Sequence, residues 1–168
     1  MGTRTAPIAA NALAPAKRLR WLLLSLLLLG LDQAAKYAAS VHLAYGEYLP
    51  VTRFFNWTHQ HNTGAAFSFL ANAGGWQNAF LIVLALVVST ALGCWLWREN
   101  ASRTYQIALC AIIGGALGNV TDRLLRGYVV DFLDFHYGQW HWPAFNLADV
   151  WIIVGAAALI WAQGRRAG

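Results

Sequence analysis

The sequence predicts an all-α polytopic membrane protein with four transmembrane helices, and three observations support this fold class. Apolar residues make up 58% of the 168 residues. Charged residues make up only 11%, against about 25% in ordinary soluble domains. Several apolar runs approach the length of about 20 residues that crosses a bilayer, and basic residues cluster beside them. This composition excludes a disordered chain, a coiled coil and a cytosolic enzyme.

Four segments are expected to span the membrane, over about 19–39, 77–97, 104–121 and 145–163. The second is the clearest, because residues 79–97 carry no charge and form about 28 Å of helix. The third contains a run of small residues from Gly114 to Gly118, which predicts close contact with neighbouring helices. For the first segment, 19–39, a cleaved signal peptide is the alternative to a span. An uncleaved span is preferred because Asp32 and Lys36 do not suit a signal peptide and three apolar segments follow.

The segments between the spans differ in character. Residues 51–58 are aromatic, β-branched and partly alternating, which favours short strands of a small sheet on the membrane surface within about 41–70. Residues 122–144 form a mixed segment that contains three of the seven acids. Residues 1–17 and 165–168 are expected to be cytoplasmic tails, so that 18–164 forms a single domain.

The distribution of charge predicts the orientation of the chain. Four spans place both termini on one side, and that side holds eight basic residues against one acid, a net charge of +7. The opposite side and its adjoining span ends carry −2. The positive-inside rule therefore predicts cytoplasmic termini. The overall charge of +5 is assigned to this topology, and no nucleic-acid partner is expected.

Ionisable residues in or beside a span are costly and are therefore candidates for function. Asp32 and Lys36 are one helical turn apart, so they can neutralise each other within the first span. Asp122 and Arg123 fall at the outer end of the third span. For these two, an interfacial anchor and a contact with substrate are both open.

Asp131 and Asp149 are harder to explain as structural charges. Asp131 lies in an apolar run with no basic residue nearer than Arg126, and Asp149 leads directly into an apolar run. Two carboxylates that meet in a medium of low dielectric share one proton. In aspartic proteases, one such carboxylate accepts the proton of water while the other polarises the scissile carbonyl. Acid pairs also build transporter sites, so a small proton-coupled transporter that uses Asp32 or Asp149 is the alternative.

Five motifs follow one another along the chain. They are Leu31-Asp32-Gln33-x-x-Lys36, Asn62-Thr63-Gly64-Ala65-Ala66-Phe67-Ser68, Gly114-Gly115-Ala116-Leu117-Gly118-Asn119-x-x-Asp122-Arg123, Val129-Val130-Asp131-Phe132 and Phe145-Asn146-Leu147-Ala148-Asp149. Together they resemble the ordered motifs of bacterial lipoprotein signal peptidase, signal peptidase II, over about residues 18–164. A single motif would be weak, but five in order across four spans are highly specific.

The resemblance implies an aspartyl endopeptidase of the bacterial inner membrane that removes signal peptides from prolipoproteins, cutting before the diacylglyceryl-modified cysteine. The implied catalytic residues are Asp131 and Asp149, near the periplasmic face. The implied substrate site is lined by Asn62, Gly64, Asn119, Arg123 and Asn146, with support from Asp32, Lys36 and Asp122. The family also has a periplasmic β-cradle, which matches about 41–70, and a mobile periplasmic loop or helix before the last span. The expected partners are diacylglyceryl-prolipoproteins and membrane lipids, and the protein is expected to be a monomer.

Neither a cofactor nor a metal is expected. His59 and His61 share a strand face, but no Cys or Glu-x-x-His partner completes a ligand set. Cys94 and Cys110 lie inside apolar runs, so a disulfide is not expected. Asp134 adds a third acid close to the Asp131 and Asp149 pair, but only that pair is expected to carry the chemistry.

Overall fold

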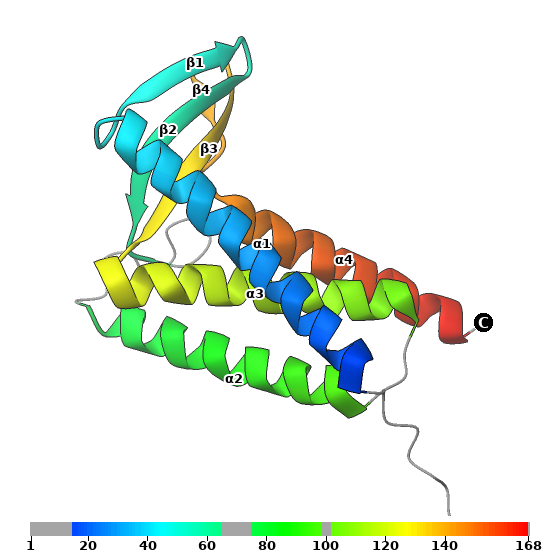
Figure 1. Cartoon of the computed structure of the whole chain (residues 1–168). Helices are drawn as coiled ribbons and strands as arrows, with labels where there is room; N and C mark the ends of the chain where they lie inside the picture. The colour runs from blue at the N-terminus through cyan, green and yellow to red at the C-terminus, as the bar shows by residue number, and fades with distance from the viewer. Residues whose placement is uncertain (1–14, 65–74, 99–101, 168) are drawn as a thin grey trace, which may run out of the picture.

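The computed structural model describes residues 15–64, 75–98 and 102–167, which form four long helices and one four-stranded sheet (Figure 1). In chain order the elements are α1 (Pro15–His42), β1 (Tyr48–Thr52), β2 (Phe55–Asn62), α2 (Trp76–Arg98), α3 (Arg103–Arg126), β3 (Val129–Tyr137), β4 (Trp140–His141) and α4 (Leu147–Ala167). Each helix contains a segment that is long and apolar enough to cross a membrane. The four expected spans therefore correspond to four helices.

The helices extend beyond the expected spans. Helix α1 already begins at Pro15 and α4 continues to Ala167, so part of each expected tail is helical. Helix α3 begins after Ser102, whose Oγ accepts a hydrogen bond from the backbone N–H of Tyr105. It ends at Gly127, which has a positive φ of 79° and donates its N–H to the carbonyl of Arg123. The third helix therefore passes the expected end at 121 by five residues.

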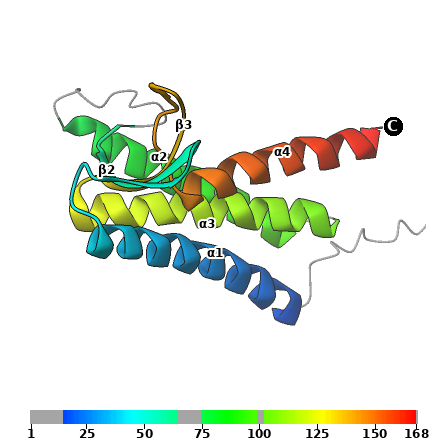
Figure 2. The ribbon, with the colours of Figure 1, turned by 90° about the horizontal axis from the view of Figure 1, so that it is seen from above.

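Helix α3 lies in the middle of the bundle and packs against the other three helices. Seen from above, it runs between α1 and α4 (Figure 2). The close contact predicted from the small residues is confirmed, because a Cβ at Gly114 would lie 2.7 Å from the carbonyl oxygen of Ser25 in α1. A Cβ at Gly115 would lie 2.4 Å from the carbonyl oxygen of Ala148 in α4. Glycine therefore sets the distance from α3 to both neighbouring helices.

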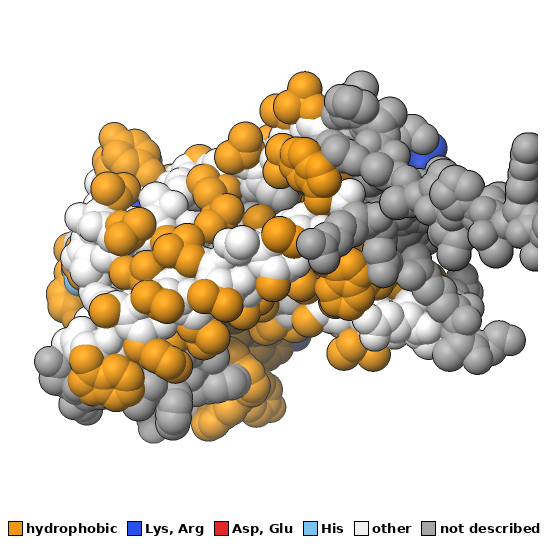
Figure 3. Space-filling view, turned by 90° about the horizontal axis from the view of Figure 1, so that it is seen from below, with side chains coloured by type: hydrophobic (Ala, Val, Ile, Leu, Met, Phe, Trp, Pro, Cys, Tyr) orange, Lys and Arg blue, Asp and Glu red, His pale blue; other side chains and the backbone are white. Residues whose placement is uncertain are grey.

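The outward faces of the helices are apolar. Leu23 and Leu27 on α1, Val87 on α2 and Ile153 on α4 are all more than half exposed. Figure 3 shows apolar side chains spread over the described part of one whole face of the molecule, with few charges among them. An exterior of this kind suits lipid rather than water, because large apolar patches are rare on soluble proteins. The molecule accordingly has the form of a multi-pass membrane protein.

The sheet shows that the all-α prediction is incomplete. All its strands are antiparallel, in the order β1-β2-β3-β4. The expected strands within 41–70 correspond to β1 and β2, whereas residues 65–70 lie outside the described part of the chain. Residues 122–144 were expected to form a loop or helix. Apart from the end of α3, they instead supply β3 and β4.

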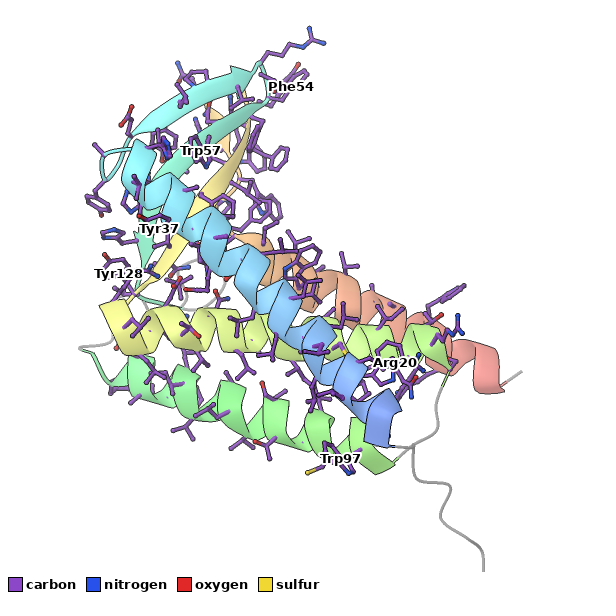
Figure 4. All side chains as sticks on the ribbon, viewed as in Figure 1. Arg20, Tyr37, Phe54, Trp57, Trp97 and Tyr128 are labelled. Carbon is purple, nitrogen blue, oxygen red and sulfur yellow. The ribbon has the colours of Figure 1, made fainter. Side chains whose placement is uncertain are left out.

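The sheet stands at one end of the bundle, where α1 and α3 end and α4 begins (Figure 1). Phe54 and Trp57 lie on the sheet, whereas Arg20 and Trp97 lie at the opposite end of the helices (Figure 4). The start of α1 and the end of α4 also lie at that opposite end, as expected for a chain with four spans. Strand β3 connects the sheet to α3 and thereby brings Asp131 to the junction between sheet and helices.

Candidate active site

Four elements direct polar side chains into one end of a pocket of about 560 Å³. The pocket is lined there by Asn62 of β2, Asn119 and Arg123 of α3, Asp131 of β3, Asn146, and Asp149 of α4. The rest of its lining is apolar and comes mainly from α2, α3, α4 and residues 142–145. Both expected catalytic residues and four of the five expected substrate-binding residues are thus brought together.

Asn146 connects the two aspartates through the start of α4. Its Oδ1 accepts a hydrogen bond from the backbone N–H of Asp149 at 3.0 Å, and Asp149 Oδ2 accepts one from the backbone N–H of Asn146 at 3.2 Å. This reciprocal pair is a capping box, which satisfies N–H groups that a helix start leaves unpaired. The side-chain Nδ2 of Asn146 donates to Asp131 Oδ1 at 2.6 Å. One fully buried side chain therefore holds Asp131 and Asp149.

Asp131 is 3% exposed and lies outside the membrane-spanning helices. Asn62 Nδ2 donates to its Oδ2 at 3.0 Å, so each carboxylate oxygen has one amide donor. Burial, and the negative charge of Asp149 beside it, raise the pKa of Asp131 to about 7. Neutral and ionised forms of this carboxyl are therefore both populated near neutral pH.

Asp149 is oriented from α3. Asn119 Nδ2 donates to Asp149 Oδ1 at 2.9 Å, and Asn119 Oδ1 accepts a hydrogen bond from Lys36 Nζ at 2.8 Å. Because an ammonium can only donate, Lys36 fixes which end of the Asn119 amide faces Asp149. The contact to the aspartate is thus a donated hydrogen bond.

Lys36 belongs to a buried charge cluster that confirms and extends the expected pair with Asp32. Its Nζ lies 2.8 Å from Asp32 Oδ2 and 3.0 Å from Asp122 Oδ2, and all three side chains are fully buried. Together with Asn119, these contacts use the three donors of the ammonium. Asp122 also pairs with Arg126. Buried charges need such complete pairing, because an unpaired charge in a dry interior is strongly unfavourable.

The charge cluster also holds the backbone on both sides of the pocket. Asp32 Oδ1 accepts a hydrogen bond from the N–H of Ala148 in the first turn of α4 at 2.8 Å. Asp122 Oδ2 accepts one from the N–H of Val130 in β3 at 3.1 Å. Val130 precedes Asp131, and Ala148 precedes Asp149. The cluster therefore positions the two segments that carry the aspartates.

Arg123 joins the pocket to the end of β2. Its Nη2 donates to the carbonyl of Gly64 at 2.6 Å, and the N–H of Gly64 donates to Asn62 Oδ1 at 2.9 Å. Gly64 is thus linked to the site through its backbone. Among the described residues, none accepts a hydrogen bond from the buried Nε of Arg123. Within the described part of the chain this Nε is therefore a buried donor without an acceptor.

The ring nitrogens of His59 and His61 contact other groups of the protein. His59 Nδ1 lies 3.0 Å from the carbonyl of Leu43 and must carry a proton, since a carbonyl only accepts. The Nε2 atoms of His59 and His61 lie 3.2 Å apart. Within the described parts of the chain, no three His, Cys, Asp or Glu side chains are grouped to bind a metal. Sequence reasoning gave no role to Gln33, whose Nε2 donates to Asp122 Oδ1 at 3.2 Å, although Gln33 stands in the first motif.

Comparison with known proteins identifies the family. The family model described as "Signal peptidase (SPase) II" matches residues 24–164, most of the chain. The chain belongs to the signal peptidase II family. Membership in signal peptidase II supports a protease that removes signal peptides from lipoproteins and does not favour a transporter.

Relatives carry the name of this family, and a solved membrane enzyme has a similar fold. A lipoprotein signal peptidase of Serratia marcescens is 54% identical over 134 residues, covering 80% of this chain and 78% of the relative. One from Burkholderia mallei (strain SAVP1) is 48% identical over 158 residues, covering 94% of this chain and 92% of the relative. A bacterial membrane enzyme solved by the in meso method at 2.3 Å resolution is 27% identical with a TM-score of 0.79, covering 94% and 93% of the two chains.

Proposed function

We propose that this signal peptidase II is an aspartic endopeptidase that cleaves prolipoproteins at the membrane, with Asp131 and Asp149 as its catalytic residues. The observation that carries this proposal is the capping box of α4, through which Asn146 holds both carboxyl groups at the polar end of an apolar pocket. A pKa of about 7 for Asp131 supports a pair that shares one proton near neutral pH.

The chemistry requires one carboxylate and one carboxylic acid on either side of a water molecule. The ionised group accepts a proton from water as its oxygen attacks the scissile carbonyl, while the protonated group donates a hydrogen bond to the carbonyl oxygen. Return of a proton to the leaving amine then breaks the C–N bond and restores the pair. The amide donors on Asp131 and Asp149 stabilise ionised carboxylates, which keeps a base available in spite of burial.

Substrate contacts are proposed for Asn62, Gly64, Asn119, Arg123 and Asn146. Four of these side chains line the pocket, and Arg123 Nε is a buried donor for which the described residues provide no acceptor. A peptide carbonyl placed there would gain a hydrogen bond and relieve the cost of an unsatisfied donor. Gly64 would contribute through the backbone that Arg123 holds.

The apolar part of the pocket fits a lipid-modified substrate. Leu84 and Val88 of α2 and Ile153 and Val154 of α4 line it and remain exposed on the bundle surface. Acyl chains of a diacylglyceryl-modified cysteine could thus stay in contact with lipid while the preceding peptide bond reaches the carboxyl pair. We therefore place the cut before this cysteine.

The proposed orientation follows from charge. The side with the termini carries a net charge of +7, and the other side carries −2. This difference favours cytoplasmic termini in the inner membrane. Arg20 lies at the end of the bundle where α1 starts and α4 ends, away from the sheet (Figure 4). Residues 41–70 and 122–144, and with them the active site, then lie near the periplasmic face. We propose a single domain over 18–164 that acts as a monomer, in contact with membrane lipids and without a cofactor.

The test uses the purified full-length protein in lipid and two forms of one prolipoprotein, with and without the diacylglyceryl group. Release of the signal peptide from the modified form alone is the expected result. Equal cleavage of both forms would contradict the proposed role of the lipid. No cleavage of either form would contradict the proposed function.

A further inference from the structure

Asp134 is a buried carboxylate that the proposed chemistry does not use. It follows Asp131 by three residues on β3, is 2% exposed and lies outside the pocket lining. Asn56 Nδ2 of β2 donates to its Oδ2 at 2.7 Å, and His141 Nδ1 of β4 lies 2.9 Å from both carboxylate oxygens. A His141 tautomer with a proton on Nδ1 would donate to this carboxylate. Asp134 therefore connects three neighbouring strands.

His141 immediately precedes the segment 142–145, which forms one wall of the pocket. This segment runs back along β3. The N–H of Trp142 donates to the carbonyl of Phe135 at 2.8 Å, and Phe145 exchanges hydrogen bonds with Leu133 at 2.9 and 3.1 Å. Asn146 follows immediately and donates to Asp131. The two carboxylates of β3 thus bind the residues on either side of the segment 142–145: Asp134 contacts His141, and Asp131 contacts Asn146.

A buried carboxylate is a costly way to stabilise a hairpin. Apolar side chains of similar volume often stabilise an interior as well or better, and the best-attested use of a buried polar pair is to fix a register. Register matters here, because a slip of one residue turns every side chain of a strand to the opposite face. Such a slip in 142–145 would move Asn146 away from Asp131.

We propose that Asp134 and His141 are positioning residues for the proteolytic reaction. Their hydrogen-bonded pair fixes residues 142–145 against β3 and so holds Asn146 where it can reach Asp131 and Asp149. Neither residue touches the reacting atoms. This inference rests on the proposed function, since it concerns the arrangement of the same carboxyl pair.

The test measures kcat and KM for cleavage of the diacylated prolipoprotein by Asp134→Ala, His141→Ala, the double variant and Asp134→Asn. Each alanine variant is expected to lower kcat by about 10- to 100-fold, the effect of a small misplacement at a reacting centre, with little change in KM. The double variant should be no slower than the slower single variant, because both changes remove the same contact. Asp134→Asn should recover most of the rate, since its amide oxygen still accepts from His141.

Glu47→Gln is the matched control. It also removes one carboxylate beside the sheet, but Glu47 is exposed and its carboxylate accepts a hydrogen bond from the N–H of Ala44 in the turn before β1. Its kcat should equal that of the wild type. His141 is 43% exposed in its side chain on a short edge strand, so His141→Ala decides the outcome if Asp134→Ala does not fold.

The inference is overturned by a wild-type kcat in His141→Ala, by a change in KM alone, or by strictly additive losses in the double variant. A wild-type protein that cleaves no prolipoprotein would instead contradict the proposed function. The two failures are therefore distinguishable.

Discussion

Lys36 in the first helix and Asp149 at the start of the last are joined through the amide of one residue. Lys36 Nζ donates to Asn119 Oδ1 at 2.8 Å, and Asn119 Nδ2 donates to Asp149 Oδ1 at 2.9 Å. The ammonium thus determines the orientation of the amide that contacts the aspartate. A residue about 110 positions away in the sequence consequently controls one side of the proposed catalytic pair.

Replacing Lys36 tests this link. Lys36→Met would leave Asp32 and Asp122 buried with less compensation and would free the Asn119 amide to turn. We expect a loss of about 3–5 kcal/mol in the free energy of unfolding, typical of a broken buried ion pair, together with loss of cleavage. Thermal unfolding in detergent and the cleavage assay measure the two effects. Tyr37→Phe, at the exposed neighbouring position, should match the wild type in both.

The two aspartates of the proposed pair should be indispensable. Asp131→Asn and Asp149→Asn keep nearly the same shape but cannot share a proton, so each should abolish cleavage while the precursor still binds. Cleavage followed by gel shift, and precursor binding by co-purification, are the measurements. Asp134→Asn should retain most of its activity, which separates loss of the pair from loss of one nearby charge. Substantial cleavage by either of the first two variants would show that the pair is wrongly assigned.

The pKa of Asp131 predicts a pH dependence of cleavage. With a pKa of about 7, the shared proton is progressively lost as the pH rises above this value, and kcat/KM, which reports the free enzyme, should fall on the alkaline side. A rate that stays constant from pH 6 to about 9 would contradict a shared proton.

The raised pKa of Asp131 also predicts that the stability of the fold depends on pH. The pKa of Asp131 in the folded state lies above its ordinary value of 3.8, so the folded state binds this proton more tightly than the unfolded state. Its ionisation therefore destabilises the fold progressively as the pH rises from about 4 to about 7. The melting temperature of Asp131→Asn relative to the wild type should rise over this range. A constant difference would mean that burial does not disfavour the ionised group.

Gly115 should tolerate no side chain. A Cβ there would lie 2.4 Å from the carbonyl of Ala148, so Gly115→Ala must push the start of α4 away from α3. We expect a destabilisation of about 1–3 kcal/mol, as for other overpacked sites, and reduced cleavage because Asp149 moves with α4. Gly93→Ala is the control, since a Cβ at Gly93 meets nothing within 4 Å. Equal stability of the two variants would contradict the close packing of these helices.

The orientation of the chain can be tested with reporters. A reporter that is active only in the periplasm should be silent when fused after Gly168, and the same reporter inserted at Gly138, in the turn between β3 and β4, should be active. Activity at the C-terminus would reverse the proposed topology and move the active site to the cytoplasmic face.

The sequence predicted the helices well because their evidence is local. Each span is a run of apolar residues, and the contact of Gly114 and Gly115 with neighbouring helices follows from their size. Strand β3 was missed because it pairs with β2, which lies about 70 residues earlier. The residues 129–137 by themselves do not indicate with which strand they pair. The loop or helix expected there came from the family resemblance, although the β-branched and aromatic residues of 129–137 are typical of a strand.

The candidate site was predicted as a set of residues but not as an arrangement. The spacing Asn146-x-x-Asp149 is a local signal for a capping box and could have been recognised. Two further contacts depend on how β3 lies against its neighbours. Asn146 also holds Asp131, and Asp134 faces His141 and Asn56. Such contacts arise from the tertiary structure and have no signature in a single sequence.

The capping box of α4 has a consequence for inhibition and resistance. Asn146 closes the helix start and holds both aspartates, so a substitution there changes the stability of α4 and the carboxyl pair at once. A compound that binds through Asn146 would therefore leave the bacterium few escape mutations, because evading the drug would also damage its target. Leu84 and Val88 line the apolar wall of the pocket and hold neither the helix start nor the aspartates. Resistance mutations should therefore arise first at such residues.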